Sequence, residues 1–182
     1  MGLDMYLNKK VYIGANYDFN NISGKIEITS NGELIPINFK KVTYIVEEAV
    51  YWRKANQIHK WFVNNVQNGV DDCGEYYVSD DDIKKLLETI NNLFAEVNKI
   101  VDLSEIDFEK IEVKDFNVKV EEHQNKIDEI CSKYLPTQSG CFFGGITYDY
   151  FYFYDLNYTR KKFEELLKEE NKHGSFFYHS SW

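Results

Sequence analysis

Residues 76–87 read YYVSDDDIKKLL and place a short strand directly before a helix. Ser79 followed by three aspartates is typical of a helix N-cap whose first-turn carboxylates complement the helix dipole. Apolar residues then recur at helical spacing, at positions 83, 86, 87, 90, 93, 94, 97 and 100. We therefore predict a strand over 75–78 and an amphipathic helix over 79–101.

The rest of the chain also mixes strand and helix patterns. Aromatic and β-branched residues favour strands, and Asn31-Gly32 is typical of a tight hairpin turn, while Pro36 favours an edge position. We predict further strands over 3–13, 25–29, 34–39, 141–143 and 175–182. We predict further helices over 47–67, 121–134 and 156–170.

This order lacks strict βαβ alternation, so the expected class is α+β, with a mixed, mostly antiparallel sheet and several packed helices. The 182 residues fit one domain, 1–182. Residues 14–45 and 102–120 are less regular, and we interpret them as insertions.

Composition limits the function classes. Lys and Arg number 21 against 30 Asp and Glu, for a net charge of −9, which argues against tracking a DNA backbone. No apolar run approaches the roughly 20 residues of a membrane-spanning helix. Three cysteines without metal-type spacing fit a reducing cytoplasm, and we expect no metal and no cofactor. Aromatic residues make up 16% of the chain, as in a pocket for a planar polar ligand or in a crowded core.

The densest group of candidate binding side chains lies in residues 51–62, YWRKANQIHKWF. On the predicted helix, Trp52, Asn56 and His59 share one face, which offers a stacking plane, an amide and an imidazole. An amphipathic helix with a solvated basic side would show the same pattern, so both interpretations stay open. The neighbouring side chains that would hold a phosphate or extend the stacking surface are Arg53, Lys54, Lys60 and Trp61.

Three other segments carry candidate chemistry. Residues 71–75, DDCGE, place carboxylates near a thiol, which fits acid–base or cation chemistry but equally a solvated turn. Residues 135–144, LPTQSGCFFG, would present backbone N–H groups and polar side chains to a ligand, although they match no phosphate-binding loop motif. Residues 148–155, YDYFYFYD, fit either base recognition or an oligomer interface.

These segments resemble a family of small proteins found in bacteriophages and prophages. The resemblance rests on MGLDMYL at 1–7, YWRKANQIHKWFV at 51–63, GVDDCGEYYVS at 69–79, LPTQSG with FFG at 135–144, and SSW at 180–182. Membership implies a phage origin and a place in the cytoplasm of an infected or lysogenic bacterium. Small accessory phage proteins often counter host defences, some by sequestering nucleotide signals, so an anti-defence role is implied by analogy.

The leading hypothesis is a non-enzymatic homo-oligomer that binds and sequesters a small anionic nucleotide-like ligand. The first alternative is a nucleotide or phosphoester hydrolase that uses His59 with Asp71, Asp72 and Glu75. The second is an acidic inhibitor of a host protein. The ligand-binding residues expected under the leading hypothesis are Trp52, Arg53, Lys54, Asn56, His59, Lys60, Trp61, Gln138, Ser139 and Tyr148.

Overall fold

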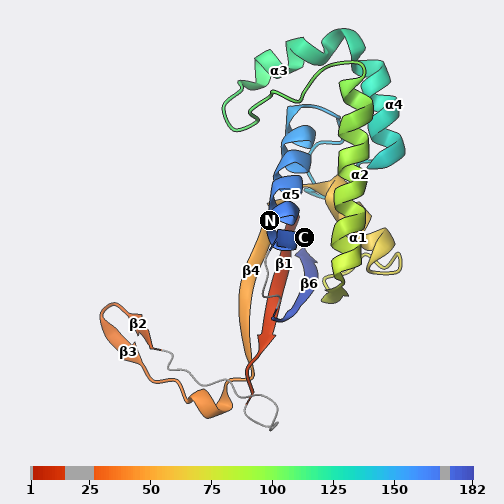
Figure 1. The fold of residues 1–182 in the computed structure, drawn as a ribbon. Coiled ribbons are helices and arrows are strands. Elements are labelled where there is room, and N and C mark those ends of the chain that lie inside the picture. The colour runs from red at the N-terminus through yellow and green to blue at the C-terminus, as the bar shows by residue number, and fades with distance from the viewer. Residues whose placement is uncertain (1, 15–26, 169–172) are drawn as a thin grey trace.

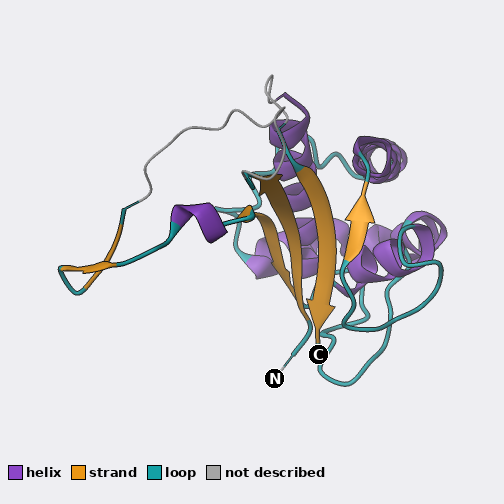
Figure 2. Ribbon diagram, turned by 90° about the horizontal axis from the view of Figure 1, so that it is seen from below, coloured by secondary structure: helices purple, strands orange, loops and turns teal. Residues whose placement is uncertain are grey.

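An antiparallel four-stranded sheet, with helices gathered on one side of it, makes up the body of the protein (Figures 1 and 2). The computed structural model describes residues 2–14, 27–168 and 173–182. The strands are β1 Asp4–Tyr12, β2 Ile28–Ser30, β3 Glu33–Ile35, β4 Tyr44–Arg53, β5 Tyr76–Val78 and β6 Ser175–Ser181. The helices are α1 Asn56–Asn65, α2 Asp80–Asn98, α3 Val113–Val120, α4 Gln124–Tyr134 and α5 Tyr150–Lys168, with short 3-10 turns η1 Phe39–Lys41 and η2 Glu121–His123. The predicted α+β class is confirmed.

The sheet has the order β4-β1-β6-β5, so the first and last strands of the chain lie together at its centre. Met5 on β1 pairs with Trp52 on β4 and with Ser180 on β6, which sets one row of the sheet. Side chains alternate between the two faces, and the inward row of Met5, Trp52 and Ser180 is almost completely buried. One face of the sheet thus forms the floor of the core.

Aromatic rings fill much of the space between this floor and the helices. Phe62 of α1 stacks on Tyr178 of β6 with ring centroids 4.0 Å apart. The Nε1–H of Trp52 donates to Thr159 Oγ1 of α5 at 2.8 Å, which ties that helix to the edge of the sheet. The high aromatic content therefore serves the core in large part.

The prediction for α2 is confirmed in detail. The Ser79 hydroxyl accepts a hydrogen bond from the Asp82 backbone N–H at 3.1 Å, and the Asp82 carboxylate accepts one from the Ser79 backbone N–H at 3.0 Å. This capping box satisfies two N–H groups that the helix leaves unpaired. The apolar stripe faces inward, with Ile83, Leu86, Ile90, Leu93, Phe94 and Val97 buried.

The predicted helix over 47–67 is wrong in its first part. Residues 44–53 form β4, and the helix begins only at Asn56. The spacing of four and three from Tyr51 suggested a helix, but residues 44–53 pair with β1, with one irregularity at Ala49, and this pairing supplies backbone hydrogen bonds between strands. Trp52 therefore lies on a strand and does not share a helix face with Asn56 and His59.

Two shorter predictions also need correction. Residues 141–143, expected as a strand, form a turn and a loop, and Phe142 has a φ of 63°, which extended pairing does not allow. The aromatic run begins a helix, because α5 starts at Tyr150 instead of residue 156. The predicted strand at 175–182 is confirmed as β6.

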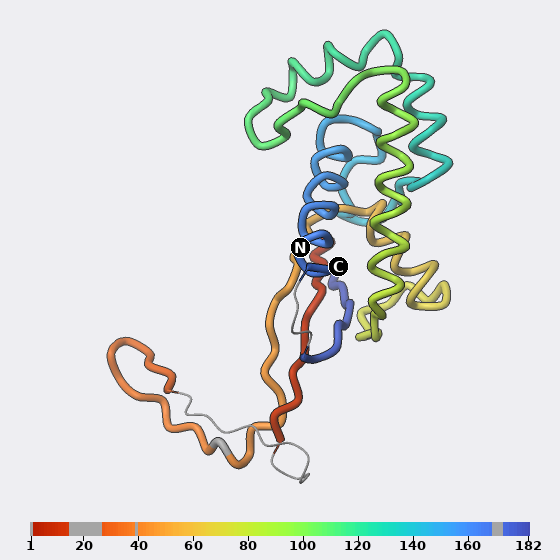
Figure 3. Tube along the Cα trace, in the orientation of Figure 1, coloured from red at the N-terminus to blue at the C-terminus, as the bar shows by residue number. Residues whose placement is uncertain are grey.

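The two segments interpreted as insertions differ from each other. Residues 102–120 contain α3 and bury Phe108 and Phe116 at 1% and 0% exposure, so they contribute to the core. Residues 27–46 form an arm: residues 27–43 extend away from the body and carry the β2–β3 hairpin, and residues 44–46 join the arm to the sheet as the start of β4 (Figure 3). Its turn has a φ of 51° at Asn31 and 83° at Gly32, as the Asn-Gly signal predicts. The predicted residues 25 and 26 lie outside the described part.

Across the described residues, none of the helices has the length and apolar character needed to cross a bilayer.

Replacing Ser79 by alanine should lower the free energy of unfolding by about 1 kcal/mol, because the capping hydroxyl of α2 is lost. For a chain of this length, that loss corresponds to a fall of about 2–4 °C in Tm, measurable by calorimetry. Ser132→Ala removes an exposed hydroxyl from α4 and should change stability by less than about 0.5 kcal/mol. Equal losses in the two variants would contradict the assigned role of the cap.

Candidate functional site

A sharp corner between β4 and α1 sets the geometry of the candidate site. Lys54 has a φ of 64°, in the left-handed region that residues with a Cβ rarely adopt. Its backbone N–H donates to the Leu3 carbonyl at 2.8 Å, which ties the corner to the central strand. Gly144 packs against it, and a Cβ at Gly144 would lie only 3.0 Å from the Lys54 Cβ. The corner thus holds Lys54 in a strained backbone conformation beside the loop that follows α4.

The buried amide of Asn56 fastens the start of α1 to this loop. Its Nδ2 donates to the carbonyl oxygens of Phe143 at 3.2 Å and Gly145 at 2.7 Å, and its Oδ1 accepts from the Gln138 backbone N–H at 2.9 Å. The side chain is 1% exposed. Since both amide hydrogens and the oxygen have partners, Asn56 has no hydrogen left to donate to a ligand.

His59 lies one turn further along α1 in a second set of polar contacts, which we call the Asp71 network. Its Nε2 is 3.0 Å from Asp71 Oδ1, and its Nδ1 is 2.7 Å from the Tyr178 hydroxyl. The other Asp71 oxygen accepts from Gln138 Nε2 at 2.9 Å. The carboxylate can only accept, so Nε2 carries the hydrogen and Nδ1 accepts from Tyr178.

The electrostatics of the Asp71 network favour a neutral imidazole. Burial lowers the pKa of His59, and the Asp71 carboxylate opposes part of that shift. Burial also raises the pKa of Tyr178 well above its usual value. Both side chains have 0% exposure. The imidazole and the phenol therefore have no face open to a substrate, only the Asp71 carboxylate is partly exposed, and the network acts as a structural link between α1, β6 and the loop.

The carboxylates proposed to assist His59 in the hydrolase hypothesis have separate partners. Asp71 belongs to the network above, whereas Asp72 accepts hydrogen bonds from the Gly74 backbone and the Tyr76 hydroxyl. Glu75 forms an ion pair with Lys10. Within the described ranges, no three His, Cys, Asp or Glu side chains gather as a metal ion would require. The hydrolase hypothesis therefore lacks a general base that a substrate could reach, because His59 is buried and the three carboxylates have separate partners.

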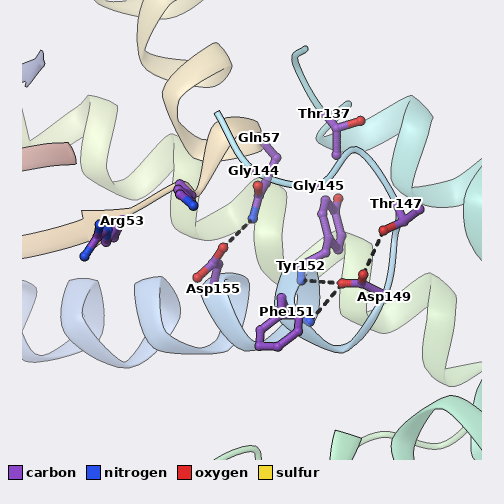
Figure 4. A pocket seen from close by; sticks show the side chains of 11 residues that line it. Arg53, Gln57, Thr137, Gly144, Gly145, Thr147, Asp149, Phe151, Tyr152 and Asp155 are labelled. Carbon is purple, nitrogen blue, oxygen red and sulfur yellow. Dashed lines mark hydrogen bonds between the residues drawn. The ribbon is translucent and has the colours of Figure 1, made fainter. Parts of the chain in front are cut away.

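A cavity of about 410 Å³ opens beside the corner (Figure 4), and its lining includes none of the Asp71, His59 and Tyr178 side chains. It lies between the end of β4, the first turn of α1, the 137–149 segment and the start of α5. Its lining residues are Arg53, Lys54, Gln57, Thr137, Gly144, Gly145, Thr147, Asp149, Phe151, Tyr152 and Asp155.

Positive and negative side chains occupy different parts of this cavity. Lys54 forms no ion pair with any described residue, and Arg53, whose side chain is 64% exposed, has only a long contact of 3.9 Å to Asp4. Asp155 accepts a hydrogen bond from Gln57 Nε2 at 3.3 Å, as Figure 4 shows. Burial raises the pKa of Asp155 to about 7, despite that hydrogen bond.

Asp149 has a structural role at the cavity wall. Its Oδ1 accepts from the backbone N–H groups of Phe151 and Tyr152 at 3.0 and 3.4 Å, which caps the start of α5. Its Oδ2 accepts from the Thr147 hydroxyl at 2.7 Å. The loop is therefore connected to α5 at the point where Phe151, 62% exposed, presents its ring.

The predicted site residues thus separate into four groups. Arg53 and Lys54 line the cavity. Asn56 and Lys60 form hydrogen bonds with the 137–145 loop directly, the latter from Nζ to the Thr137 carbonyl at 3.2 Å. His59 is linked to Gln138 of that loop through Asp71, so these side chains meet through internal hydrogen bonds. Trp52 and Trp61 are 2% and 8% exposed, which leaves no free ring face on Trp52 for a base. Ser139 is exposed outside the cavity lining, and Tyr148 lines a different groove.

Sequence reasoning missed Gln57, Phe151 and Asp155 as cavity residues. Each lies within a segment that the sequence marked, 51–62 or 148–155. A helix beginning at Tyr150 would have placed Phe151 and Asp155 four positions apart on one face, but the period-two pattern of tyrosines obscured that spacing.

The chain matches no protein-family model, no curated protein and no solved structure. The family resemblance drawn from the motifs stays an expectation, and the site is interpreted from its own chemistry.

The buried His59 predicts a loss of stability in acid. The unfolded chain binds a proton near pH 6.5, but folded His59 resists it, so the free energy of unfolding should fall as pH drops below 6.5, by at most about 1.4 kcal/mol per pH unit. His59→Gln should remove this contribution in denaturant titrations at pH 5.5 and 7.5. The same substitution at exposed His173 is the control, and an unchanged slope in His59→Gln would contradict the assignment.

The raised pKa of Asp155 predicts the opposite pH dependence, a free energy of unfolding that falls as the pH rises. Its pKa is raised from 3.8 to about 7 in the folded state, so its contribution to stability is complete below pH 3.8 and is lost as pH rises through 7. Asp155→Asn should therefore gain stability relative to the wild type between pH 5 and pH 8, on the order of 2 kcal/mol. Asp128→Asn on α4 serves as the control. A constant difference across this range would refute the raised pKa.

Proposed function

We propose that the protein binds a small anionic, nucleotide-like ligand in the cavity beside Lys54 and sequesters it without converting it. The observation that carries this proposal is the pair of adjacent cations, Arg53 and Lys54, at a cavity of about 410 Å³, with no close ion-pair partner for either among the described residues. Two cations that lack a close partner favour an incoming phosphate or carboxylate.

The remaining lining suits the other end of such a ligand. Gln57 offers an amide, and Asp155 offers a carboxyl group that is largely protonated below pH 7. These groups donate and accept hydrogen bonds, as the edge of a base or the hydroxyls of a sugar require. Phe151 is 62% exposed and supplies an aromatic ring for a planar group. The ligand is thus expected to place its anion at Lys54 and its polar ring towards α5.

The strained backbone at Lys54 supports a binding role for this residue. Glycine would adopt a φ of 64° without the steric penalty that lysine incurs, which is on the order of 1 kcal/mol or more. Strain of this kind gathers at ligand-binding positions. The presence of lysine at a position that glycine would occupy with less strain therefore supports a functional role for the lysine ammonium group. The role implied by the phage resemblance, capture of a host defence signal in the bacterial cytoplasm, is the biological form of this proposal.

Asp155 favours one alternative. A carboxyl group with a pKa of about 7 in a cavity has the properties of a general acid or base, so turnover of the bound ligand by Asp155 is the second candidate. Chromatography of the ligand after incubation with the protein distinguishes the two. Recovery of unchanged ligand supports sequestration, and conversion that is lost in Asp155→Asn supports catalysis.

Lys54→Gly separates binding from folding. The substitution removes the ammonium group and the backbone strain together, so the Tm should be unchanged or higher. Loss of a charge-assisted hydrogen bond of about 1.5–3 kcal/mol should raise the Kd for an anionic nucleotide more than tenfold. Calorimetric titration with a ligand selected from a nucleotide panel by thermal shift measures both quantities.

Lys84→Ala, an exposed lysine on α2, is the matched control for binding and should leave the Kd unchanged. The proposal is overturned if no anionic nucleotide at millimolar concentration raises the Tm of the wild type. It is equally overturned if Lys54→Gly binds the selected ligand as tightly as the wild type.

A further inference from the structure

The arm formed by residues 27–46 exposes more apolar surface than a free segment should. Seven of the sixteen large hydrophobic side chains that are exposed in the described residues belong to it, four before β4 and three on the first residues of β4, which pair with β1. All residues of β2 and β3 are exposed. The seven side chains are Ile28, Leu34, Ile35, Ile37, Tyr44, Ile45 and Val46.

A two-stranded hairpin without a core is at best marginally stable in water. The β2–β3 hairpin pairs only within a two-stranded sheet, separate from the main one. Exposed apolar groups in such a segment point to a surface that is covered by another molecule. The η1 turn, where the arm approaches β4, also carries two exposed lysines, Lys40 and Lys41, which form no ion pair with any described residue. Its partner should therefore offer both apolar and negative groups.

A groove of about 700 Å³ at the other end of the molecule has this chemistry. It lies between α3, η2, α4 and the 146–149 segment, and its apolar side chains include Val118 and Ile146, which are 71% and 57% exposed. None of the described residues that line it is basic. Its three carboxylates form no ion pair with any described residue; they are those of Glu121, Asp128 and Asp149.

We infer that the arm of one copy docks into this groove of a second copy. The arm offers adjacent aliphatic residues followed by Lys40 and Lys41, and the groove offers aliphatic residues bordered by carboxylates, so both the apolar and the charged parts match. Figure 3 shows the arm at one end of the molecule and α3 and α4, whose residues line the groove, at the other, so an arm cannot reach the groove of its own chain. The contact joins two different surfaces, and such contacts build rings or filaments unless two copies exchange arms.

Charge reversal tests the pairing directly. Wild-type protein should form species heavier than the 21.6 kDa monomer in light scattering, with a fraction that falls as salt is raised. Lys40→Glu with Lys41→Glu places like charges at the contact, and so does Glu121→Lys with Asp128→Lys. Each double variant alone should raise the dissociation constant for self-association at least tenfold.

Mixing the two double variants gives the decisive result. The reversed arm of one then matches the reversed groove of the other, so an equimolar mixture should assemble with an affinity within a few-fold of the wild type. General damage to either surface would not be repaired in this way. Lys84→Glu with Lys85→Glu on α2 has the same charge change and should leave assembly intact.

Three outcomes overturn the inference. The first is a wild-type protein that stays monomeric at millimolar concentration. The second is a mixture of the two double variants that fails to assemble. The third is a loss of assembly in the α2 control equal to that in the arm variant, which would indicate an effect of net charge alone. None of these outcomes bears on ligand binding at Lys54.

Discussion

The buried amide of Asn56 is the contact on which the candidate site depends. It pairs three backbone groups of the 138–145 loop with the first turn of α1, at a position that is 1% exposed. Leaving any one of these backbone groups buried without a partner would destabilise the folded state by on the order of 1–3 kcal/mol. An aspartate of the same size could not donate to the two carbonyls, and a leucine could not pair any of the three. The loop is therefore held by a side chain with one suitable chemistry.

Once the loop is in place, its position relative to the corner at Lys54 creates the cavity. Gly144 allows the loop backbone to approach Lys54, and Asp149 connects the far end of the loop to α5. The result is a pair of cations, Arg53 and Lys54, at one part of the cavity on a chain with a net charge of −9. Such a local field, more than the total charge, decides which ligands a cavity attracts. Thr147 and Asp149 line both this cavity and the groove beside α3, so one short segment forms a wall of each.

Part of the site could be predicted from residue types alone. Both 51–62 and 135–144 carry predicted ligand-binding residues, and the two segments meet through Asn56, Lys60 and Gln138. The side of α1 that faces the cavity could not be predicted, because the helix begins later than the spacing suggested. That shift moves Trp52 into the sheet, makes His59 part of a buried network, and brings Gln57 opposite Asp155. Residues with conspicuous chemistry thus support the fold, and plainer neighbours line the cavity.

The sequence by itself determined the features that depend on near neighbours: the capping box at Ser79, the apolar stripe of α2, the Asn31-Gly32 turn and the α+β class. Only the tertiary structure decided that residues 44–53 form a strand, because their backbone groups pair with a strand some forty residues earlier in the chain. The spacing of neighbouring residues does not indicate these long-range hydrogen bonds. It also decided which polar side chains are buried. A histidine or a tryptophan has the same local pattern in a site as in a core, and the difference arises from whether distant elements close over it.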